Sequence, residues 1–525
     1  MNVLLINLAR MGDLVQITSV SQGLKEELGA RVTLLAPSRY AEFAQRLAGV
    51  DEVFSIDDTN LSQNSAFESS AIYADPLLRQ CVATLNSRSF NLVINLTHDE
   101  LSTALAVAVG ARTIRGRFGQ PGYIQVRGDA FRYFYAILEH REMNGINLCD
   151  IYRIGAGIKT GHRPVSMTLL PEDLVAVRRR IGATARPTIL LHPGANHPHR
   201  RWPAESYGKL ASLLRSEGAE VLVLAGPGEN ELASAVERAS QGTARVIPGA
   251  VPAELLPALM SQADLVITND TGPLHIAAAV GTPTLSLFLA MARPQDTGPY
   301  APGQLIFETL ENCHPCPEHH TCDSVVCGQS IPVEAVFAAA RVRLNGAMPT
   351  SMDFQAYGGR YRVMVTQWDA NGMLALHEIH QSAPKPEGID SSETWTPFWL
   401  ALFDGQLPTQ DQLRLIQGMM GIDDQRALLA VATLCEGILA RLNGEDLRDG
   451  NGNLLSVSIL EDIALQEENR SNSVKPILLP FRLEREALYA RGVDVVRREA
   501  KSRFTRWIRA LTALSPDAVR EEVAA

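Results

Sequence analysis

The sequence of 525 residues has no hydrophobic run long enough to cross a membrane and no excess of positive charge. Even the apolar stretch 285–292 stops at Arg293, well short of the ~20 residues that a transmembrane helix needs. The first ten residues lack a basic segment before their apolar core, so we expect no secretion signal and a cytoplasmic protein. The formal net charge of −10 argues against a nucleic-acid partner.

Cysteine is also scarce, and its distribution is uneven. Of seven cysteines, three are scattered and four lie close together, namely Cys313, Cys316, Cys322 and Cys327. Four thiolates at this spacing can close a tetrahedral site around zinc or iron, and in a reducing compartment such crowding favours a metal over disulfides. The alternatives are free or redox-active thiols, and mixed ligation by one of the nearby histidines, His314, His319 and His320.

The length and composition predict a globular chain of several domains. Hydrophobic residues make up 46% and charged residues 20%, which is typical of a chain that folds. A length of 525 residues corresponds to three or four compact units. The sequence contains no internal repeat.

Two blocks of the sequence alternate short β-branched runs with helical periodicity, which predicts a mostly parallel sheet in each. The expected strands are 3–8, 31–36, 53–56 and 91–96, then 188–192, 220–225, 244–247, 265–269 and 284–288. The expected helices are 14–28, 40–47, 76–86, 101–109, 131–157, 171–181, 203–216, 229–239, 252–262 and 274–280. We therefore predict two doubly wound α/β domains, 1–182 and 183–345, that face a cleft. Ligands of such folds bind at the carboxyl ends of the strands.

The remaining residues, 350–525, are predicted to form an accessory domain. Residues 354–380 alternate as a β-hairpin around the turn 369–372, and the rest is mainly helical. Residues 493–514 form a basic amphipathic helix, which either packs on this domain or lies peripherally on an anionic membrane surface. Recognition of a protein acceptor, dimerisation and support of the fold are the open roles of this domain, and the sequence does not predict the oligomeric state.

The first motif that carries chemistry is Arg10-Met11-Gly12-Asp13, directly after the first expected strand. Gly12 permits a tight turn, and Asp13 projects from the carboxyl end of the strand. A carboxylate held there could act as a general base. The alternative is an ordinary capping aspartate at the start of a helix.

The second motif is the loop 191–203, which follows the first strand of the second block. It contains Asn196 and ends with Arg200, Arg201 and a proline at the start of a helix. Arginine offers a planar fork of donors to phosphate oxygens, and the helix N-terminus adds backbone donors. We therefore predict donor-phosphate contacts here, the alternative being two solvated arginines.

The third motif, residues 269–275, again joins a strand to a helix through a tight loop. Asp270 stands at the strand tip, Thr271 and Gly272 present backbone amides, and His275 lies on the first helical turn. Together these groups predict a cradle for a diphosphate. The alternative for His275 is a histidine of the core.

The order of these motifs, with Ala-Gly-Pro-Gly-Glu at 225–229 between the last two, resembles glycosyltransferase family 9, the ADP-heptose:lipopolysaccharide heptosyltransferases. The resemblance covers about residues 1–344. It implies the GT-B architecture of two Rossmann-like domains. It also implies transfer of a heptose from ADP-heptose, with inversion, to a lipopolysaccharide or another cell-surface glycan.

The resemblance also implies residue roles. Asp13 matches the catalytic base, Arg200 stands where a lysine usually contacts the donor phosphate, and residues 270–275 match the donor-binding loop. The loop 226–231 matches the segment whose acidic residue meets the nucleotide ribose, either Glu229 or Glu231. In this mechanism Asp13 takes a proton from the acceptor hydroxyl, while Arg200, His275 and the loop amides stabilise the departing ADP.

The sequence has no D-x-D motif, so we expect no catalytic metal. Bacterial autotransporter heptosyltransferases resemble this sequence in having a metal-bound cysteine motif after the donor loop, which favours a structural metal remote from catalysis. Two departures leave alternatives: Arg200 replaces the usual lysine, and residues 350–525 lie outside the family pattern. These alternatives are an enzyme of the same fold with another nucleotide sugar or a protein acceptor, and a non-catalytic scaffold that binds nucleotide sugars.

Overall fold

The computed structural model describes most of the chain up to residue 385, and it describes little beyond that point. The described residues are 1–57, 75–120, 123–138, 141, 144–159, 161, 163–182, 187–316, 322, 324–385, 396 and 399–400. The expected loop 59–71 and the basic helix 493–514 lie outside them. The chain divides into two compact units, Met1–Gly122 with Ile146–Glu387, and Tyr123–Gly145 with Gly388–Ala525.

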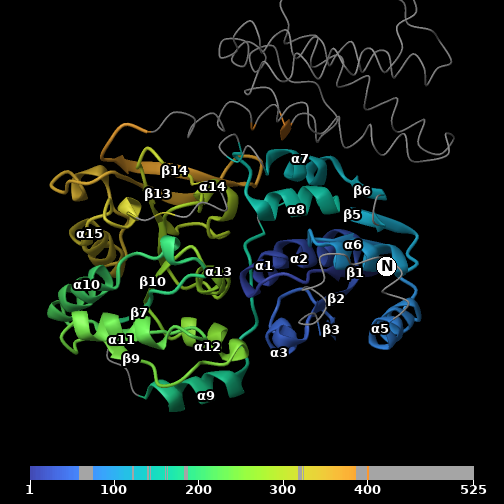
Figure 1. The fold of residues 1–525 in the computed structure, drawn as a ribbon, viewed down its shortest axis with the longest axis horizontal. Coiled ribbons are helices and arrows are strands. Elements are labelled where there is room, and N and C mark those ends of the chain that lie inside the picture. Colours follow the sequence, from blue (N-terminus) through green and yellow to red (C-terminus); the bar gives the residue numbers. More distant parts are fainter. Residues whose placement is uncertain are drawn as a thin grey trace, which may run out of the picture. The chain divides into compact units, whose positions relative to one another are not determined.

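The first unit contains two α/β domains, and the first of them is built on a parallel sheet. Within this unit the strands are ordered β3-β2-β1-β4-β5 (Figure 1). Their bounds are β1 (Asn2–Ile6), β2 (Arg31–Pro37), β3 (Glu52–Ile56), β4 (Leu92–Asn95) and β5 (Thr113–Gln120). Residues 3–6 of β1 are fully buried, as expected for a central strand covered on both faces.

The helices of this domain agree closely with the sequence pattern. They are α1 (Met11–Gln16), α2 (Thr18–Leu28), α3 (Ala41–Ala44), α5 (Pro76–Asn86), α6 (Glu100–Ala108) and α8 (Leu148–Ala156). The expected helix 14–28 is divided at Ile17. Strand β5 was not predicted, because Gly116 and Gly119, both with positive φ, interrupt its apolar pattern.

The second domain has an eight-stranded sheet with the order β14-β13-β12-β11-β10-β7-β8-β9. Its parallel strands are β7 (Thr188–His192), β8 (Glu220–Val223), β9 (Arg245–Val246), β10 (Leu265–Asn269), β11 (Thr284–Phe288) and β12 (Leu305–Thr309). Its helices are α9 (Pro171–Ile181), α10 (Ala204–Ser216), α11 (Asn230–Ala239), α12 (Leu256–Met260), α13 (Gly272–Ala279), α14 (Pro294–Thr297) and α15 (Val333–Leu344). In Figure 1, α10, α11 and α15 lie on one side of the sheet, and α12 and α13 lie on the other.

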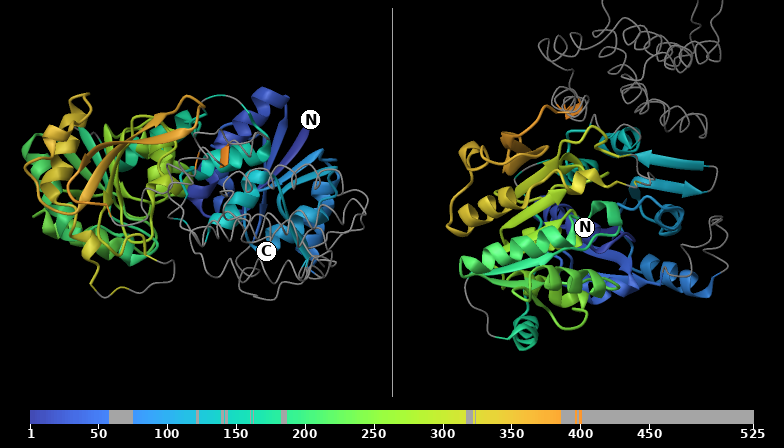
Figure 2. Two further views of the ribbon diagram at one scale, coloured as in Figure 1. Left: turned by 90° about the horizontal axis from the view of Figure 1, so that it is seen from above. Right: turned by 60° about the vertical axis from the view of Figure 1, so that its left-hand side comes forward.

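The predicted hairpin is present, but it belongs to the second sheet. Strands β13 (Tyr361–Trp368) and β14 (Leu374–Gln381) pair with each other, and β13 runs antiparallel to β12. Figure 2 shows the hairpin in orange alongside that sheet. The ring of Tyr361, which is buried, stacks on Phe307 of β12 at a centroid distance of 5.8 Å. Aromatic packing therefore makes the hairpin an extension of the second domain, whereas the sequence suggested that it opens the accessory domain.

The two domains of the first unit are joined by buried polar contacts. Asp150 of α8 has no exposed surface and accepts hydrogen bonds from the Tyr300 hydroxyl at 2.6 Å and the Leu374 amide at 3.0 Å. Asn147 Nδ2 also donates to the Gly298 carbonyl oxygen at 3.1 Å. Because a buried carboxylate that loses its donors is costly, these contacts hold α8 of the first domain against the second.

The described part of the second unit is small. It contains β6 (Tyr123–Arg127) and α7 (Asp129–Ile137), where the sequence predicted one helical stretch, 131–157. The ring of Tyr133 lies 5.0 Å from that of Trp399, and its hydroxyl bonds to Asn144 Oδ1 at 2.7 Å. Of the predicted accessory domain 350–525, the helical part beyond residue 400 lies outside the described residues and stays a prediction. Among the helices that the structure describes, none combines the length and the apolar character needed to span a bilayer.

Candidate active site

The candidate active site lies where α1 of the first domain meets α13 of the second. These helices follow β1 and β10 and contact each other (Figure 1). A Cβ atom on Gly12 would lie 3.2 Å from Gly272 Cα and 3.1 Å from His275 Cδ2. The absence of side chains at both glycines therefore lets the first sequence motif meet the third.

Asp13 projects from α1 at this junction. Its Oδ2 accepts a hydrogen bond from the Arg10 amide at 3.1 Å. Burial raises the pKa of Asp13 above its usual value, although the Arg10 amide and the electrostatic effects of His275 and Arg10 lower it. The negative charge of Asp270 adds to the rise. A carboxylate with a raised pKa is a stronger base than a free aspartate.

Asp270, at the tip of β10, is the centre of a charged cluster. Arg200 Nη2 donates to both the carbonyl oxygen and the carboxylate of Asp270. The Thr297 hydroxyl donates to Asp270 Oδ2 at 3.2 Å, and His275 Nε2 lies 4.0 Å from Asp270 Oδ1. The structure therefore brings Arg200, Asp270 and His275 together.

Two buried polar atoms of this cluster lack partners among the described residues. They are His275 Nδ1 and Arg200 Nε. Burial lowers the pKa of His275, because it outweighs the charges of Asp270 and Asp13, so the ring is neutral at neutral pH. A buried donor or acceptor with no partner costs free energy, and such atoms mark a place where a polar ligand would be stabilised.

The N-terminus of α13 presents backbone donors at the same place. Thr271 is the N-cap residue, but its hydroxyl makes no capping hydrogen bond. The hydroxyl lies 3.2 Å from Thr268 Oγ1 and 3.3 Å from His192 Nδ1. Because no side chain caps the first turn, its amides can donate to an anion.

Glu229 and Glu231, which the sequence left as alternatives, have different surroundings. Glu229 Oε2 accepts from the Gly226 amide at 2.9 Å and lies 3.5 Å from His192 Nε2. Its carboxylate packs on Gly194, where a Cβ atom would approach Oε2 to 2.1 Å. Glu231 instead pairs with Arg238 at 2.7 Å, and its side chain is 85% exposed. The structure thus brings Glu229, and not Glu231, to the carboxyl edge of the sheet.

The electrostatics of Glu229 favour an ionised carboxylate. Burial alone would raise its pKa, but the hydrogen bond from His192, the Gly226 amide and Arg201 together lower it below its usual value. Arg201 Nη2 lies 3.9 Å from Glu229 Oε1, while its Nε donates to the Ala195 carbonyl oxygen at 2.9 Å. Glu229 therefore offers a charged acceptor beside the loop that follows β7.

Several residues that shape this site were not singled out from the sequence. The side chain of Asn269, fully buried, bonds to the carbonyl oxygens of Pro193 and Gly194 and accepts from the Trp202 amide. It fixes the loop that carries Arg200. His192 and Thr297 are two further residues of the site that were not singled out from the sequence. Asn196, a predicted donor-binding residue, is exposed in the same loop, and its donor contact stays a prediction.

The cysteine loop follows β12. Cys313 is exposed, Cys316 and Cys322 are half-buried and Cys327 is buried, all as free thiols. Burial and the neighbouring thiols raise the pKa of Cys316 to about 11. Among the residues that the structure describes, which omit 317–321 and 323, no group of three or more histidine, cysteine or acidic side chains is arranged to hold a metal ion.

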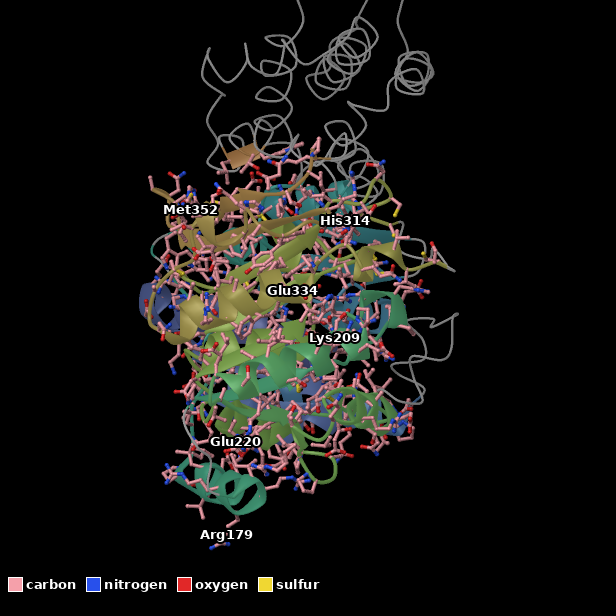
Figure 3. All side chains as sticks on the ribbon, turned by 90° about the vertical axis from the view of Figure 1, so that its left-hand side faces the viewer. Arg179, Lys209, Glu220, His314, Glu334 and Met352 are labelled. Atoms are coloured by element: carbon pink, nitrogen blue, oxygen red, sulfur yellow. The ribbon has the colours of Figure 1, made fainter. Side chains whose placement is uncertain are left out.

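His314 within this loop is committed to other partners (labelled in Figure 3). Its Nδ1 lies 2.8 Å from the Ala290 carbonyl oxygen and its Nε2 lies 2.9 Å from Glu308 Oε1. Both partners are acceptors, so each ring nitrogen donates a hydrogen and the ring is an imidazolium. Neither nitrogen has a lone pair for a metal, which removes His314 from the alternative ligand set.

Two Rossmann-like domains whose strand ends meet at one site define the GT-B fold. A solved structure with this likeness is a glycosyltransferase family 9 protein of Veillonella parvula, with a TM-score of 0.55 and 20% identity over 66% of this chain and 98% of that one. Residues 78–324 match the sequence model of Glycosyltransferase family 9 (heptosyltransferase). The resemblance seen in the sequence is thereby confirmed for this part of the chain.

Curated relatives are similar at modest identity. A lipopolysaccharide core heptosyltransferase of Haemophilus influenzae is 32% identical over 119 residues, which are 22% of this chain and 34% of the relative. Lipopolysaccharide heptosyltransferase 3 of Escherichia coli is 25% identical over 215 residues, 39% of this chain and 62% of the relative. The matched segments thus span less than two thirds of either relative.

Proposed function

We propose that the protein is an inverting glycosyltransferase that transfers a heptose from ADP-heptose to a lipopolysaccharide or another cell-surface glycan. The observation that carries the proposal is the approach of Asp13 on one domain to Asp270 and His275 on the other. A pure nucleotide-sugar binder has no need of a carboxylate base opposite a phosphate cradle. The family match and the names of the relatives supply the sugar and the acceptor class.

In the proposed reaction each group has a separate task. Asp13 takes the proton from the acceptor hydroxyl as the oxygen attacks the anomeric carbon, and the bond from that carbon to the diphosphate breaks. Arg200 and the amides of Thr271 and Gly272 stabilise the negative charge that develops on ADP. Neutral His275 donates a hydrogen bond to the same oxygens. Glu229 accepts hydrogen bonds from the ribose hydroxyls of the donor.

The substitution Asp13→Asn tests the base. It keeps an oxygen for the Arg10 amide and removes the proton acceptor, so we expect transfer to fall by at least 10³-fold while ADP binding persists. Glu231→Gln, at an exposed carboxylate, is the control and should transfer at the native rate. Full activity of Asp13→Asn would refute this role, and binding without any transfer by the native protein would favour the scaffold.

A panel of ADP-, GDP-, UDP- and dTDP-sugars tests the donor. A ligand that binds the folded state raises the apparent melting temperature, so the ADP-sugar should give the largest shift. A larger shift with another nucleotide would keep the fold and the base but replace the donor. Purified lipopolysaccharide core and a protein acceptor, offered in parallel with labelled donor, decide between the two acceptor classes.

We also propose a structural zinc or iron at Cys313, Cys316, Cys322 and Cys327, apart from the reaction. The thiols act on one another electrostatically, and the Val325 amide donates to Cys322 Sγ at 3.3 Å, a contact that suits a thiolate. The site involves the cysteine loop alone, and the proposed reaction has no step at this metal. Elemental analysis of protein purified without added metal should find about one equivalent, and less than a tenth would refute the site.

The proposal places the enzyme in the cytoplasm, with peripheral contact to the inner face of the membrane through residues 493–514. Liposome flotation tests this contact. Binding to anionic vesicles that weakens at high salt would support it, because ionic screening weakens surface electrostatics. Equal flotation of the full chain and of a chain truncated before residue 493 would refute it.

A further inference from the structure

His192, at the carboxyl end of β7, lies between two candidate donor-binding residues. It is buried, with 5% of its surface exposed. On one side its Nε2 lies 3.5 Å from Glu229 Oε2. On the other side its Nδ1 lies 3.1 Å from Thr268 Oγ1 and 3.3 Å from Thr271 Oγ1. The imidazole therefore spans the gap between the α11 loop and the donor loop of α13.

The partners of the ring fix its tautomer. A carboxylate accepts hydrogen bonds, so Nε2 carries the hydrogen that faces Glu229. Nδ1 then presents a lone pair, and each threonine hydroxyl can donate either to it or to the Asn269 carbonyl oxygen, which lies 3.1 Å from Thr268 Oγ1 and 3.3 Å from Thr271 Oγ1. The order Glu229, His192, Thr271 forms a directed chain of polar contacts from one strand end to the next.

This chain has a consequence for the helix N-terminus. A threonine at an N-cap normally turns its oxygen to the amides of the first helical turn. Thr271 does not, because its hydroxyl is directed to His192, Thr268 and the Asn269 carbonyl oxygen. If the hydroxyl turned to the helix, only the Leu274 amide could donate to it, because Pro273 has no N–H.

We propose that His192 is a positioning residue that couples nucleoside recognition by Glu229 to diphosphate recognition at Thr271. The inference rests on the proposed function, because it assumes that a nucleoside diphosphate occupies this edge of the sheet. His192 holds the Glu229 carboxylate in place on one side and the Thr271 hydroxyl in place on the other. The residues that bind the ribose and the diphosphate of the donor are therefore both positioned by the imidazole of His192.

Substitutions that keep one end of the ring at a time test the coupling. His192→Asn retains a polar atom near Nδ1 and loses the contact to Glu229, whereas His192→Gln retains one near Nε2 and loses the threonines. We expect each to weaken ADP binding about threefold and His192→Leu about tenfold, measured by calorimetry. Tyr207→Phe is the matched control, since its hydroxyl donates only to the His192 carbonyl oxygen at 3.4 Å, and it should bind ADP as the native protein does.

A double-mutant cycle separates coupling from simple packing. In the native background the combined effect of Glu229→Gln and Thr271→Val on ADP binding should differ from the product of the single effects by at least threefold. In the His192→Leu background the effects of Glu229→Gln and Thr271→Val on ADP binding should be independent, so that the product of the single effects equals the effect of the double substitution. Independent effects in the native background, or ADP binding by folded His192→Leu within twofold of the native value, would overturn the proposal.

A second measurement does not depend on the nucleotide. The ¹⁵N shifts of histidine-labelled protein, assigned by loss of one signal in His192→Gln, should show His192 with hydrogen on Nε2 near neutral pH. Hydrogen on Nδ1 would overturn the chain of contacts. If ADP fails to bind but GDP, UDP or dTDP binds, the cycle is run with that nucleotide. If no nucleotide binds, the proposed function is refuted. The tautomer of His192 is then the remaining test of its position between Glu229 and Thr271.

Discussion

The backbones of Gly12 and Gly272 meet at the junction of the two domains, and Gly272 would crowd a side chain placed on Gly12. A methyl group on Gly12 would come within 3.2 Å of Gly272 Cα, and one on Gly272 would come within 3.1 Å of Met11 Cε. This contact sets how close Asp13 approaches the donor loop. The catalytic geometry therefore depends on two residues that have no functional group.

Gly12→Ala should slow transfer more than it weakens donor binding. The methyl group would push α1 and α13 apart by a few tenths of an ångström, and small displacements of reacting groups cost up to ~10²-fold in rate. We expect kcat to fall roughly 10- to 100-fold with the ADP dissociation constant within about threefold of native. Gly358→Ala is the control, because its methyl would meet nothing within 4 Å, and equal losses in both variants would contradict this account.

The raised pKa of Asp13 predicts the acid limb of the activity profile. Transfer requires the carboxylate, so kcat/KM should fall as pH drops through a pKa above the ~3.9 of a free aspartate. Burial is the main cause of the raised pKa, so the acid limb should lie at a higher pH than it would for an exposed aspartate. A profile flat down to pH 4 would contradict the assignment of Asp13 as the base.

The raised pKa of Asp13 also affects folding stability: it favours the folded state at low pH, where activity is lost. Since the folded-state pKa exceeds that of the unfolded chain, Asp13 favours folding most below its unfolded pKa, and this contribution is lost as pH rises through the folded pKa. Asp13→Asn should therefore be at least as stable as the native protein at neutral pH. A clearly lower melting temperature at pH 7, with no such loss at pH 4, would contradict this expectation.

Arg200→Lys tests whether the guanidinium has a use beyond its charge. Arg200 Nη2 alone donates to the backbone and the side chain of Asp270, so the other guanidinium nitrogens can reach a phosphate, whereas an ammonium group has a single nitrogen for both tasks. We expect ADP affinity to fall about threefold in Arg200→Lys and 10-fold or more in Arg200→Gln, which leaves a buried carboxylate without its cation. Calorimetry with ADP measures both, and identical affinities in the two variants would show that the positive charge is dispensable.

The structure brings predicted site residues together where their spacing ties them to strand ends, and their roles stay predictions. Asp13, Arg200 and Asp270 each follow a strand, and parallel strands bring such positions to one edge. Glu229 and Glu231 were not distinguishable, because both lie within two residues of a helix start. The structure separates them: α11 begins at Asn230, so Glu229 folds back to Gly226 while Glu231 lies on the exposed face.

Other features depended on pairing that the sequence alone does not encode. The register of β7 with β10 sets His192 opposite Thr268, a relationship between residues 76 positions apart. Strand β12 was not predicted from the sequence, because its short run becomes recognisable as a strand only through its pairing with β11 and β13. Long-range pairing therefore explains both the missed strand and the missed histidine.

Glu308→Gln should destabilise the second domain and the cysteine loop attached to it. Glu308 is buried on β12, where it accepts from Arg362 Nε at 2.6 Å and from His314 Nε2 at 2.9 Å. Burial would raise its pKa, but Arg362 and His314 lower it to about 2. The glutamine would leave the buried Arg362 with Glu378, 3.6 Å away, in place of its closest counter-charge, at a cost of about 3–5 kcal/mol in free energy of unfolding.

Chemical denaturation at pH 7 measures the loss. The folded-state pKa is depressed, so the contribution of Glu308 is present above the unfolded pKa of ~4.3 and is lost as pH falls toward 2. The gap between native and Glu308→Gln proteins should therefore narrow between about pH 4 and pH 2. Glu311→Gln, whose carboxylate is partly exposed and 3.5 Å from Arg360, should cost less than about 1 kcal/mol. Equal losses in the two variants would mean that burial of the Glu308 cluster adds nothing to the stability of this domain.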